Sequence, residues 1–304
     1  MLYLLRRLWL VLLLGLAPAH AQPADQPAIT TPTKATPALW RATGPAGAIY
    51  LFGTIHLLPP ALAWRTPAYE QALTTSNRLM LELDERNLNP AVLQPTILRL
   101  GLLPEDRSLR DELGDELYNQ LSDAGAQVGV PEVTLRRMRP WLAAVSLSAI
   151  AATRMGLNPE AGVDRAILTQ ANALGLPVEG LETADEQFAH LSRLDGDAGR
   201  ALVKQTVDDL RDARTLFDRL LVAWASGDPV LLEKELVDRA AEESPVINEE
   251  LLIARNRNWL PKLRQRLLEP GTTFVAVGAG HLVGPDGLVA MLQAEGVKVE
   301  QIAP

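Results

Sequence analysis

Apolar residues along this chain fall into short runs and into longer stretches with helical spacing. A short apolar run bounded by turn residues predicts a buried strand, whereas apolar residues three or four apart predict an amphipathic helix. These patterns predict strands at residues 39–42, 48–52, 78–83, 176–181, 273–277 and 297–302, and helices at 65–76, across 90–175 and 183–267, and at 286–294. The first two strands are expected to form a hairpin.

Prolines and glycines divide the two long helical stretches into separate helices. Breaks are expected near Pro104, Pro131, Pro140 and Pro159 in the first stretch, and near Gly227 and Ser244-Pro245 in the second. Short strands separated by helices are typical of an α/β domain. We therefore predict a central mixed sheet over residues 39–304, with the long helical insertions forming a cap or flanking layers.

The first 21 residues have the composition of a secretory signal peptide. Arg6 and Arg7 precede the apolar run Leu8–Leu16, and the small residues Ala19 and Ala21 follow it. The run is shorter than the roughly 20 residues that span a bilayer, although an uncleaved anchor is the alternative. Residues 22–38, rich in proline, threonine and alanine, are expected to be a disordered leader. We expect export across the inner membrane to the periplasm, with no stable membrane insertion after cleavage.

The chain contains no cysteine and carries a formal charge of −8. Without disulfides, burial of a hydrophobic core must hold the fold together, and a metal site must use nitrogen and oxygen ligands. Loss of Arg6 and Arg7 with the signal peptide would change the charge to −10. Such an acidic protein lacks the basic surface that binds nucleic acid, and we expect no nucleic-acid partner.

Two segments far apart in the chain share a Gly-x-x-His motif after an apolar strand. They are Gly53-Thr-Ile-His56 and Gly278-Ala-Gly-His281, and the chain has only four histidines. Ligands bind at the carboxyl ends of strands in open α/β sheets, and neutral imidazole is a common ligand of transition metals. If the two strands are neighbours, both imidazoles converge on one rim. Alternatively, each histidine caps its loop by hydrogen-bonding the backbone.

Four charged residues are further candidates for this site. Glu82 and Glu182 lie within and just past apolar strands, where a carboxylate must be solvated, paired or metal-bound. Asp164 either faces the site or favours the positive end of a helix dipole. Arg255 shares a helix face with Trp259 and could stabilise an oxyanion, with a solvated helix arginine as the alternative. His190 has no partner motif and is expected at the surface or in a groove.

Other familiar catalytic motifs are missing. The chain has no His-Glu-x-x-His, no Gly-x-Ser-x-Gly and no glycine-rich phosphate loop. A serine hydrolase or a nucleotide-dependent enzyme is therefore not indicated.

The ordered set of these segments resembles the TraB/PrgY/GumN family, in its exported GumN-like branch. The resemblance runs from about Trp40 to the C-terminus. It is carried by Tyr50-Leu-Phe-Gly-Thr-Ile-His-Leu-Leu-Pro, Leu79-Met-Leu-Glu-Leu-Asp, Gly162-Val-Asp, Pro177-Val-Glu-Gly-Leu-Glu-Thr, Arg255-Asn-Arg-Asn-Trp and Val277-Gly-Ala-Gly-His-Leu-Val-Gly-Pro-Asp-Gly-Leu. Residues 39–304 would then form one TraB/GumN-like domain.

The resemblance implies a metal site and a hydrolytic activity. The family is related to the animal Tiki proteins, described as divalent-metal-dependent proteases that rely on two Gly-x-x-His motifs and a glutamate. By this resemblance His56 and His281 are metal ligands, and Glu82 is a ligand or a general base. Related branches include erythromycin-esterase-like hydrolases and a haem-associated surface protein. The chain departs from a common pattern, because Ala254 stands where relatives often carry glutamate before the helix arginine.

The leading hypothesis is a metal-dependent hydrolase, a peptidase acting on a peptide or small-molecule substrate. The ion would be Mn²⁺, Zn²⁺ or a similar divalent metal, with Arg255 stabilising the oxyanion. Glu182 and Asp164 are candidate metal ligands, or residues that hold the ligands in place by hydrogen bonds. The alternatives are a protein that binds metal, haem or peptide without turnover, and an interaction protein whose helical cap binds a partner.

Overall fold

The computed structural model describes residues 32–84, 90–238 and 244–303, which contain a six-stranded sheet in the order β4-β3-β5-β2-β1-β6. The strands are β1 (Leu39–Thr43), β2 (Gly47–Thr54), β3 (Arg78–Leu83), β4 (Val178–Glu182), β5 (Gly271–Gly278) and β6 (Lys298–Ile302). Strands β2, β5, β3 and β4 run parallel, whereas β1 is antiparallel to both β2 and β6. The predicted mixed sheet of an α/β fold is confirmed.

The strands lie close to the ranges that the apolar pattern predicts. The expected β1–β2 hairpin is present, with the Gly44 N–H donating to the Gly47 carbonyl at 2.9 Å. Strand β4 includes Glu182 as its last residue, whereas the sequence placed that residue just past the strand.

Helices fill both long insertions, and they break at the predicted prolines. The first stretch contains α3 (Pro90–Gly101), α4 (Leu109–Leu113), α5 (Asp115–Gln127), α6 (Glu132–Leu135), α7 (Pro140–Arg154), η2 (Pro159–Ala161) and α8 (Val163–Ala173). The second contains α9 (Ala184–Ser192), α10 (Gly196–Arg211), α11 (Ala213–Ser226), α12 (Pro229–Glu233), η3 (Lys234–Asp238), α14 (Pro245–Asn248), η4 (Glu249–Ile253) and α15 (Ala254–Leu268). Further breaks that were not predicted fall at Gly114 in the first stretch and at Asp195 and Asp212 in the second, and each residue precedes the next helix.

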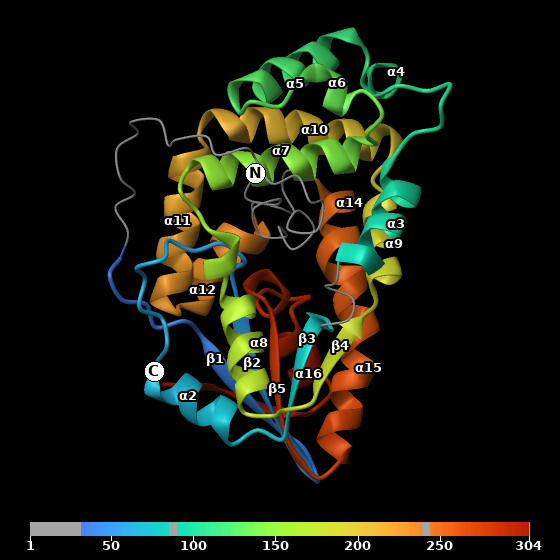
Figure 1. The fold of residues 1–304 in the computed structure, drawn as a ribbon. Coiled ribbons are helices and arrows are strands. Elements are labelled where there is room, and N and C mark those ends of the chain that lie inside the picture. The colour runs from blue at the N-terminus through green and yellow to red at the C-terminus, as the bar shows by residue number, and fades with distance from the viewer. Residues whose placement is uncertain (1–31, 85–89, 239–243, 304) are drawn as a thin grey trace.

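The helices form layers around the sheet and a cap above the carboxyl ends of its parallel strands (Figure 1). Helix α8 packs on β3, β4 and β5, and α15 packs on β2 and β4. Helix α2 (Pro67–Thr74) precedes β3, and α16 (Leu288–Ala294) follows the short η5 (Ala279–His281) and packs on β6. Helices α5, α7 and α10 lie over the edge at which the parallel strands end. The predicted site residues at these strand ends therefore face the cap side of the sheet.

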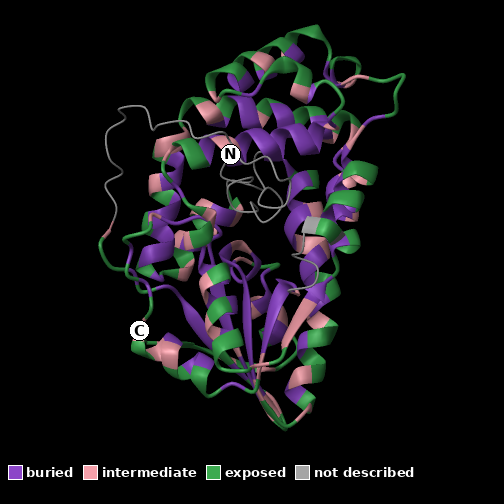
Figure 2. Ribbon diagram, viewed as in Figure 1, coloured by how far each residue is buried: buried purple, intermediate pink, exposed green. Residues whose placement is uncertain are grey.

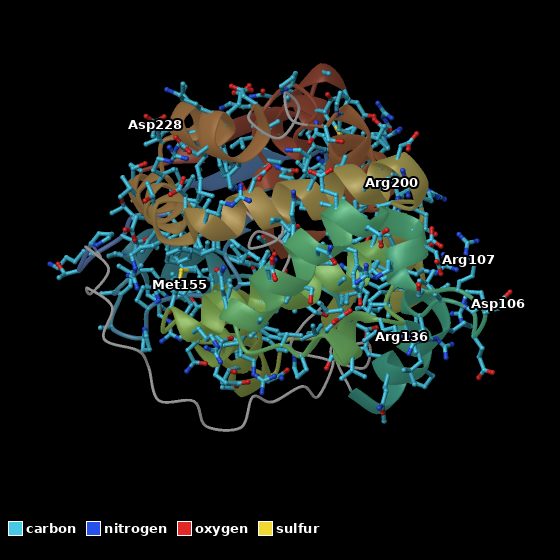
Figure 3. All side chains as sticks on the ribbon, turned by 90° about the horizontal axis from the view of Figure 1, so that it is seen from above. Asp106, Arg107, Arg136, Met155, Arg200 and Asp228 are labelled. Carbon is cyan, nitrogen blue, oxygen red and sulfur yellow. The ribbon has the colours of Figure 1, made fainter. Side chains whose placement is uncertain are left out.

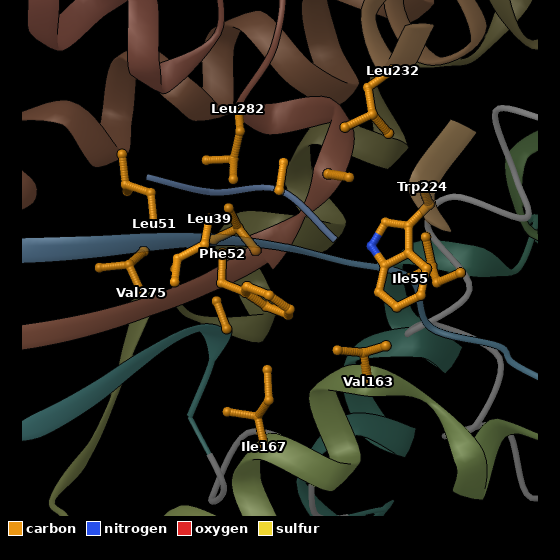
Figure 4. Close-up of a cluster of buried hydrophobic side chains, with 14 of the residues drawn as sticks. Leu39, Leu51, Phe52, Ile55, Val163, Ile167, Trp224, Leu232, Val275 and Leu282 are labelled. Atoms are coloured by element: carbon orange, nitrogen blue, oxygen red, sulfur yellow. The ribbon is translucent and has the colours of Figure 1, made fainter. Parts of the chain in front are cut away.

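Two hydrophobic clusters stabilise these layers (Figure 2). The first surrounds the sheet, where Phe52 contacts Trp64, Tyr69 and Phe274 with ring centroids 5.2–6.0 Å apart. Figure 4 shows Phe52 of this cluster near the residues contributed by α8 and α11. The second lies within the cap and includes the Trp141–Phe188 pair, 5.9 Å between centroids. Charged side chains such as Asp106, Arg107 and Arg136 extend from the outer surface (Figure 3).

The segment before β1 is partly ordered, contrary to the expected disordered leader. The Ala35 N–H donates to the Ala63 carbonyl and the Thr36 N–H to the Ala225 carbonyl, each at 2.8 Å. Ala35 and Ala38 are buried, because their small side chains fit against the first cluster. The predicted signal peptide, residues 1–21, and the leader up to residue 31 lie outside the described residues. Among the described helices, none has the length and apolar character needed to cross a membrane.

Candidate active site

The two Gly-x-x-His motifs lie side by side at the ends of neighbouring parallel strands. Strand β2 pairs with β5, with Gly53 opposite Val277 and Thr54 opposite Gly278. A Cβ atom at Gly53 would lie 3.0 Å from the Cα and Cβ atoms of Ala279, so the absence of a side chain allows the motifs to pack together. The two strands that precede the motifs are therefore neighbours, which is the condition for the two histidines to lie at one rim.

His56 is held by the beginning of helix α8. The Val163 N–H donates to the Ile55 carbonyl at 3.1 Å, and a Cβ atom at Gly162 would lie only 2.3 Å from the His56 carbonyl oxygen. This close approach places Asp164, in the first turn of α8, against the histidine ring. The His56 Nδ1 atom lies 2.7 Å from Asp164 Oδ2, and the Thr54 hydroxyl donates to Oδ1. Asp164 thus combines the two predicted possibilities, since it begins a helix and also faces the site.

These contacts fix the tautomer of His56. In the hydrogen bond between them, the Asp164 Oδ2 oxygen accepts from the His56 Nδ1–H. In the neutral ring the lone pair is then on Nε2. His56 is buried with 4% of its surface exposed, and Asp164 is buried as well.

His281 has the same tautomer, and Asn256 of helix α15 sets it. The Asn256 Nδ2 group donates to the backbone carbonyls of His281 and Asp286 at 3.2 and 2.8 Å. Its oxygen therefore faces His281 Nδ1, 2.7 Å away, and accepts a hydrogen bond from it. The His281 Nε2 lone pair in turn accepts from Arg255 Nη1 at 3.2 Å.

Arg255 links the histidine to two buried glutamates on different strands. Its Nη2 atom donates to Glu82 Oε2 at 2.5 Å, and its Nε atom lies 3.0 and 3.1 Å from the two oxygens of Glu182. The second oxygen of Glu82 accepts from the Gly278 N–H at 2.8 Å, and Glu82 Oε1 lies 3.9 Å from His281 Nε2. Arg255 is therefore a buried ion-pair partner, not a solvated helix arginine.

Trp259 packs one turn further along the same face of α15, as predicted. Its ring centroid lies 4.4 Å from that of His281 and 4.7 Å from the Arg255 guanidinium carbon. Its Nε1 donates to Glu182 Oε2 at 3.0 Å, and Gln187 Nε2 donates to Glu182 Oε1 at 2.9 Å. The side chain of Glu182 is consequently held on several sides.

The charges of this cluster stabilise each other. Burial alone would raise the pKa of Glu82, but Arg255, the two histidines and the Gly278 N–H together bring it far below its ordinary value. Burial alone would lower the pKa of Arg255, but Glu182 and Glu82 raise it above its ordinary value. Glu82 is thus a carboxylate and Arg255 a cation at any physiological pH.

The donor chemistry of the site fits a divalent metal ion, although its carboxylates are engaged by Arg255. Metal-ligating histidines typically donate their other ring N–H to a carboxylate or an amide or carbonyl oxygen, as His56 and His281 do. Among residues 32–84, 90–238 and 244–303, however, no three His, Asp or Glu side chains are placed to share an ion. Asp164 contacts His56 Nδ1, and Glu182 contacts Arg255, so both support neighbouring site residues in this arrangement.

Sequence reasoning did not assign roles to several residues of the site. Thr54, Asn256 and Gln187 make hydrogen bonds that no local pattern indicates, since each partner is brought close only by the fold. Asn256 had one signal, its place directly after Arg255 in the segment that carries the resemblance. His190 is buried rather than superficial, because its Nδ1 atom pairs with Glu250 of η4 at 2.9 Å.

The fold and the paired motifs agree with a comparison against known families. Residues 38–301 match the model of the TraB/PrgY/gumN family. The chain belongs to the TraB/PrgY/gumN family.

Curated relatives extend this assignment to several bacteria. The uncharacterized protein YbaP of Escherichia coli (strain K12) is 27% identical over 244 residues, covering 80% of this chain and 87% of that protein. YbaP of Shigella flexneri matches to the same extent. An uncharacterized protein of Treponema pallidum (strain Nichols) is 23% identical over 269 residues, covering 84% of this chain and 79% of that protein. No solved structure matches the chain significantly.

Proposed function

We propose that this protein is a metal-dependent hydrolase, a peptidase, with its active site between the two Gly-x-x-His motifs. One observation carries the proposal: two buried imidazoles from adjacent strands share the tautomer in which Nε2 holds the lone pair, beside the buried carboxylate of Glu82. Nitrogen and oxygen donors of this kind suit Zn²⁺ and Mn²⁺.

Each residue of the site has a role in this proposal. His56 and His281 would bind the ion through Nε2, and Glu82 would be the carboxylate ligand. A bound divalent ion would lower the pKa of a water molecule toward about 7 and polarise a carbonyl group. Asp164 and Asn256 hold the two rings in the ligating tautomer. The contacts of Glu82 with Arg255 and the Gly278 N–H keep it ionised, the form in which a carboxylate ligates a metal.

Arg255 would stabilise negative charge that develops on the substrate. Its guanidinium is permanently charged and adjoins both His281 and Glu82. Preorganised donors of this kind stabilise an oxyanion strongly in a buried site. The substrate is a peptide or a small molecule with a hydrolysable carbonyl group, reached after export to the periplasm through the predicted signal peptide.

Metal content of the purified protein tests the proposal. We expect about one equivalent of Zn²⁺ or Mn²⁺ by mass spectrometry after incubation with the ion and desalting. The His56→Ala/His281→Ala variant should bind none while keeping its circular dichroism spectrum, and should not cleave a peptide library that the wild type cleaves.

His190→Ala is the matched control, because His190 is also buried and paired with an acid but lies outside the site. It should keep the metal. Equal metal in the wild type and the double variant, or none in either, would contradict the proposed site.

A binding protein on the same fold is the second candidate. It is favoured by the engagement of both buried glutamates by Arg255 and by Ala254 at the position where relatives often carry glutamate. Stoichiometric capture of metal, haem or peptide with no cleavage of the library under any supplied metal would support this candidate over the hydrolase.

A further inference from the structure

One guanidinium group contacts both a proposed nitrogen ligand and the proposed carboxylate ligand. Arg255 Nη1 lies 3.2 Å from His281 Nε2, the atom that would ligate the ion. Arg255 Nη2 lies 2.5 Å from Glu82 Oε2. The single lone pair of His281 Nε2 cannot bind a metal ion and accept from Arg255 at the same time. The metal ion and the guanidinium therefore compete for this atom.

We propose that Arg255 is a built-in competitor of the metal, a cation that occupies His281 Nε2 and Glu82 Oε2 until an ion displaces Nη1 from the histidine and Nη2 from Glu82. This inference rests on the proposed function and concerns how the same site is regulated. It accounts for a site that has suitable donors but no three-residue ligand set among the described residues.

The surroundings of Arg255 allow such a displacement without expelling the side chain. Its Nε atom is held by both oxygens of Glu182, at 3.0 and 3.1 Å. Glu182 is itself fixed by Trp259 and Gln187, and the Leu251 carbonyl accepts from Nη1 at 3.3 Å. The guanidinium can therefore remain bound to Glu182 and Leu251 while it releases His281 and Glu82.

Charge balance explains why such a residue is useful. Two buried carboxylates with no cation are costly, because burial removes their hydration. Arg255 compensates Glu82 and Glu182 when the metal is absent. The same positive charge repels an incoming dication at short range in a medium of low dielectric constant, and so lowers the affinity for it.

The affinity for metal alone tests the inference, with no need for a substrate. Chelator-treated wild type, Arg255→Gln and Arg266→Gln are titrated with Zn²⁺ and Mn²⁺ by calorimetry. Arg266 is the matched control, because it lies on the same helix and pairs with Glu179 and Glu269, away from the site. We expect Arg255→Gln to bind the ion at least about tenfold more tightly than the wild type, and Arg266→Gln to bind like the wild type.

Thermal unfolding gives a second readout of the same competition. Without metal, Arg255→Gln should melt below the wild type, and metal should raise its melting temperature by more than that of the wild type. If Arg255→Gln does not fold, Arg255→Lys replaces it, since a single ammonium cannot contact Glu82, Glu182 and His281 together as the planar fork does. The lysine variant should also bind metal more tightly than the wild type.

Failure of the inference is distinguishable from failure of the proposed function. Metal that binds the folded Arg255 variants no more tightly than the wild type would overturn the competition and leave the metal site intact. Metal that binds neither the wild type nor the variants would overturn the proposed function, and the competition with it.

Discussion

At Gly53 a single missing side chain lets the two histidine motifs touch. A methyl group there would meet Ala279 at 3.0 Å, a contact tighter than ordinary packing. We expect Gly53→Ala to destabilise the protein by about 1–3 kcal/mol, because neither strand of the packed core can move freely. Urea unfolding measures this loss.

Gly280→Ala is the matched control for Gly53→Ala, since it lies in the second motif and its new methyl would meet Leu252 at an ordinary 3.5 Å. Its unfolding free energy should change by less than about 1 kcal/mol. An equal loss in both variants would show that local backbone conformation, rather than contact between the motifs, requires these glycines.

The sequence identified the candidate site residues better than the residues that form hydrogen bonds with them. His56, His281, Glu82 and Arg255 were selected because unusual residue types follow apolar strands or share a helix face. Apart from Leu251, their hydrogen-bond partners lie 25 to 196 positions away along the chain, as for Asn256 with His281 and Gly278 with Glu82. Local spacing carries no information about such pairs, so the sequence could not establish the tautomers or the ion pairs.

At the scale of elements, two helices that pack on the sheet, α8 and α15, organise the site. Helix α8 supplies Asp164 to His56, whereas α15 supplies Arg255, Asn256 and Trp259 to His281 and the glutamates. Helix α9 adds Gln187, which holds Glu182. The position of α9 depends on its first turn, where Thr183 and Glu186 form a capping box directly after β4.

Loss of this capping box should lower the unfolding free energy of the protein by an amount that depends on pH. We expect Thr183→Ala to lower the unfolding free energy by about 1 kcal/mol near neutral pH, and Thr183→Ser to preserve it. The hydrogen bond from the Thr183 N–H lowers the pKa of Glu186 below its ordinary value of 4.5. The cap therefore stabilises the fold above that value and loses its effect as the pH falls through the lowered pKa of the folded state.

Urea unfolding of these variants near neutral pH and at about pH 3 measures this dependence. The difference between Thr183→Ala and the wild type should shrink at the acidic pH. A difference that stays constant would show that the hydrogen bond between the Thr183 hydroxyl and the Glu186 carboxylate contributes nothing, since the bond from the Thr183 N–H is present in both proteins.

Individual elements were predicted well, but of their pairings in the sheet only the β1–β2 hairpin was predicted. Apolar patterns located all six strands, and the signal is continuous in β3 and β5, most of whose residues are buried on both faces. The order of the strands follows from pairing across more than 200 residues, as between β2 and β5, and no spacing rule specifies it. The helical breaks at Asp195 and Asp212 were missed because apolar periodicity continues through them.

For the whole molecule, two hydrophobic clusters imply two regions whose packing is largely independent. Phe52 and Phe274 are in contact within the sheet cluster, whereas Phe188 lies in the cap cluster. In double-mutant cycles of Phe→Leu substitutions, we expect Phe52 and Phe274 to couple by about 0.5 kcal/mol or more. Phe52 and Phe188 should add to within about 0.5 kcal/mol.

Chemical unfolding of the single and double variants measures both couplings. Matched Phe→Leu substitutions keep the lost volume the same at each position. Coupling of similar size in the two cycles would contradict the division into two clusters.

The position of β5 has a consequence for how the chain is made. This strand is the fifth along the chain but the third in the sheet, where it separates the β2–β1–β6 side from the β3–β4 side. A polypeptide that ends before Gly271 therefore holds two strand pairs that no strand joins into one sheet, and it lacks His281. Contacts so distant in sequence form late, after most of the chain is available. Premature termination anywhere in the first nine-tenths of translation should thus give aggregation-prone or proteolysed products rather than a partly active fragment.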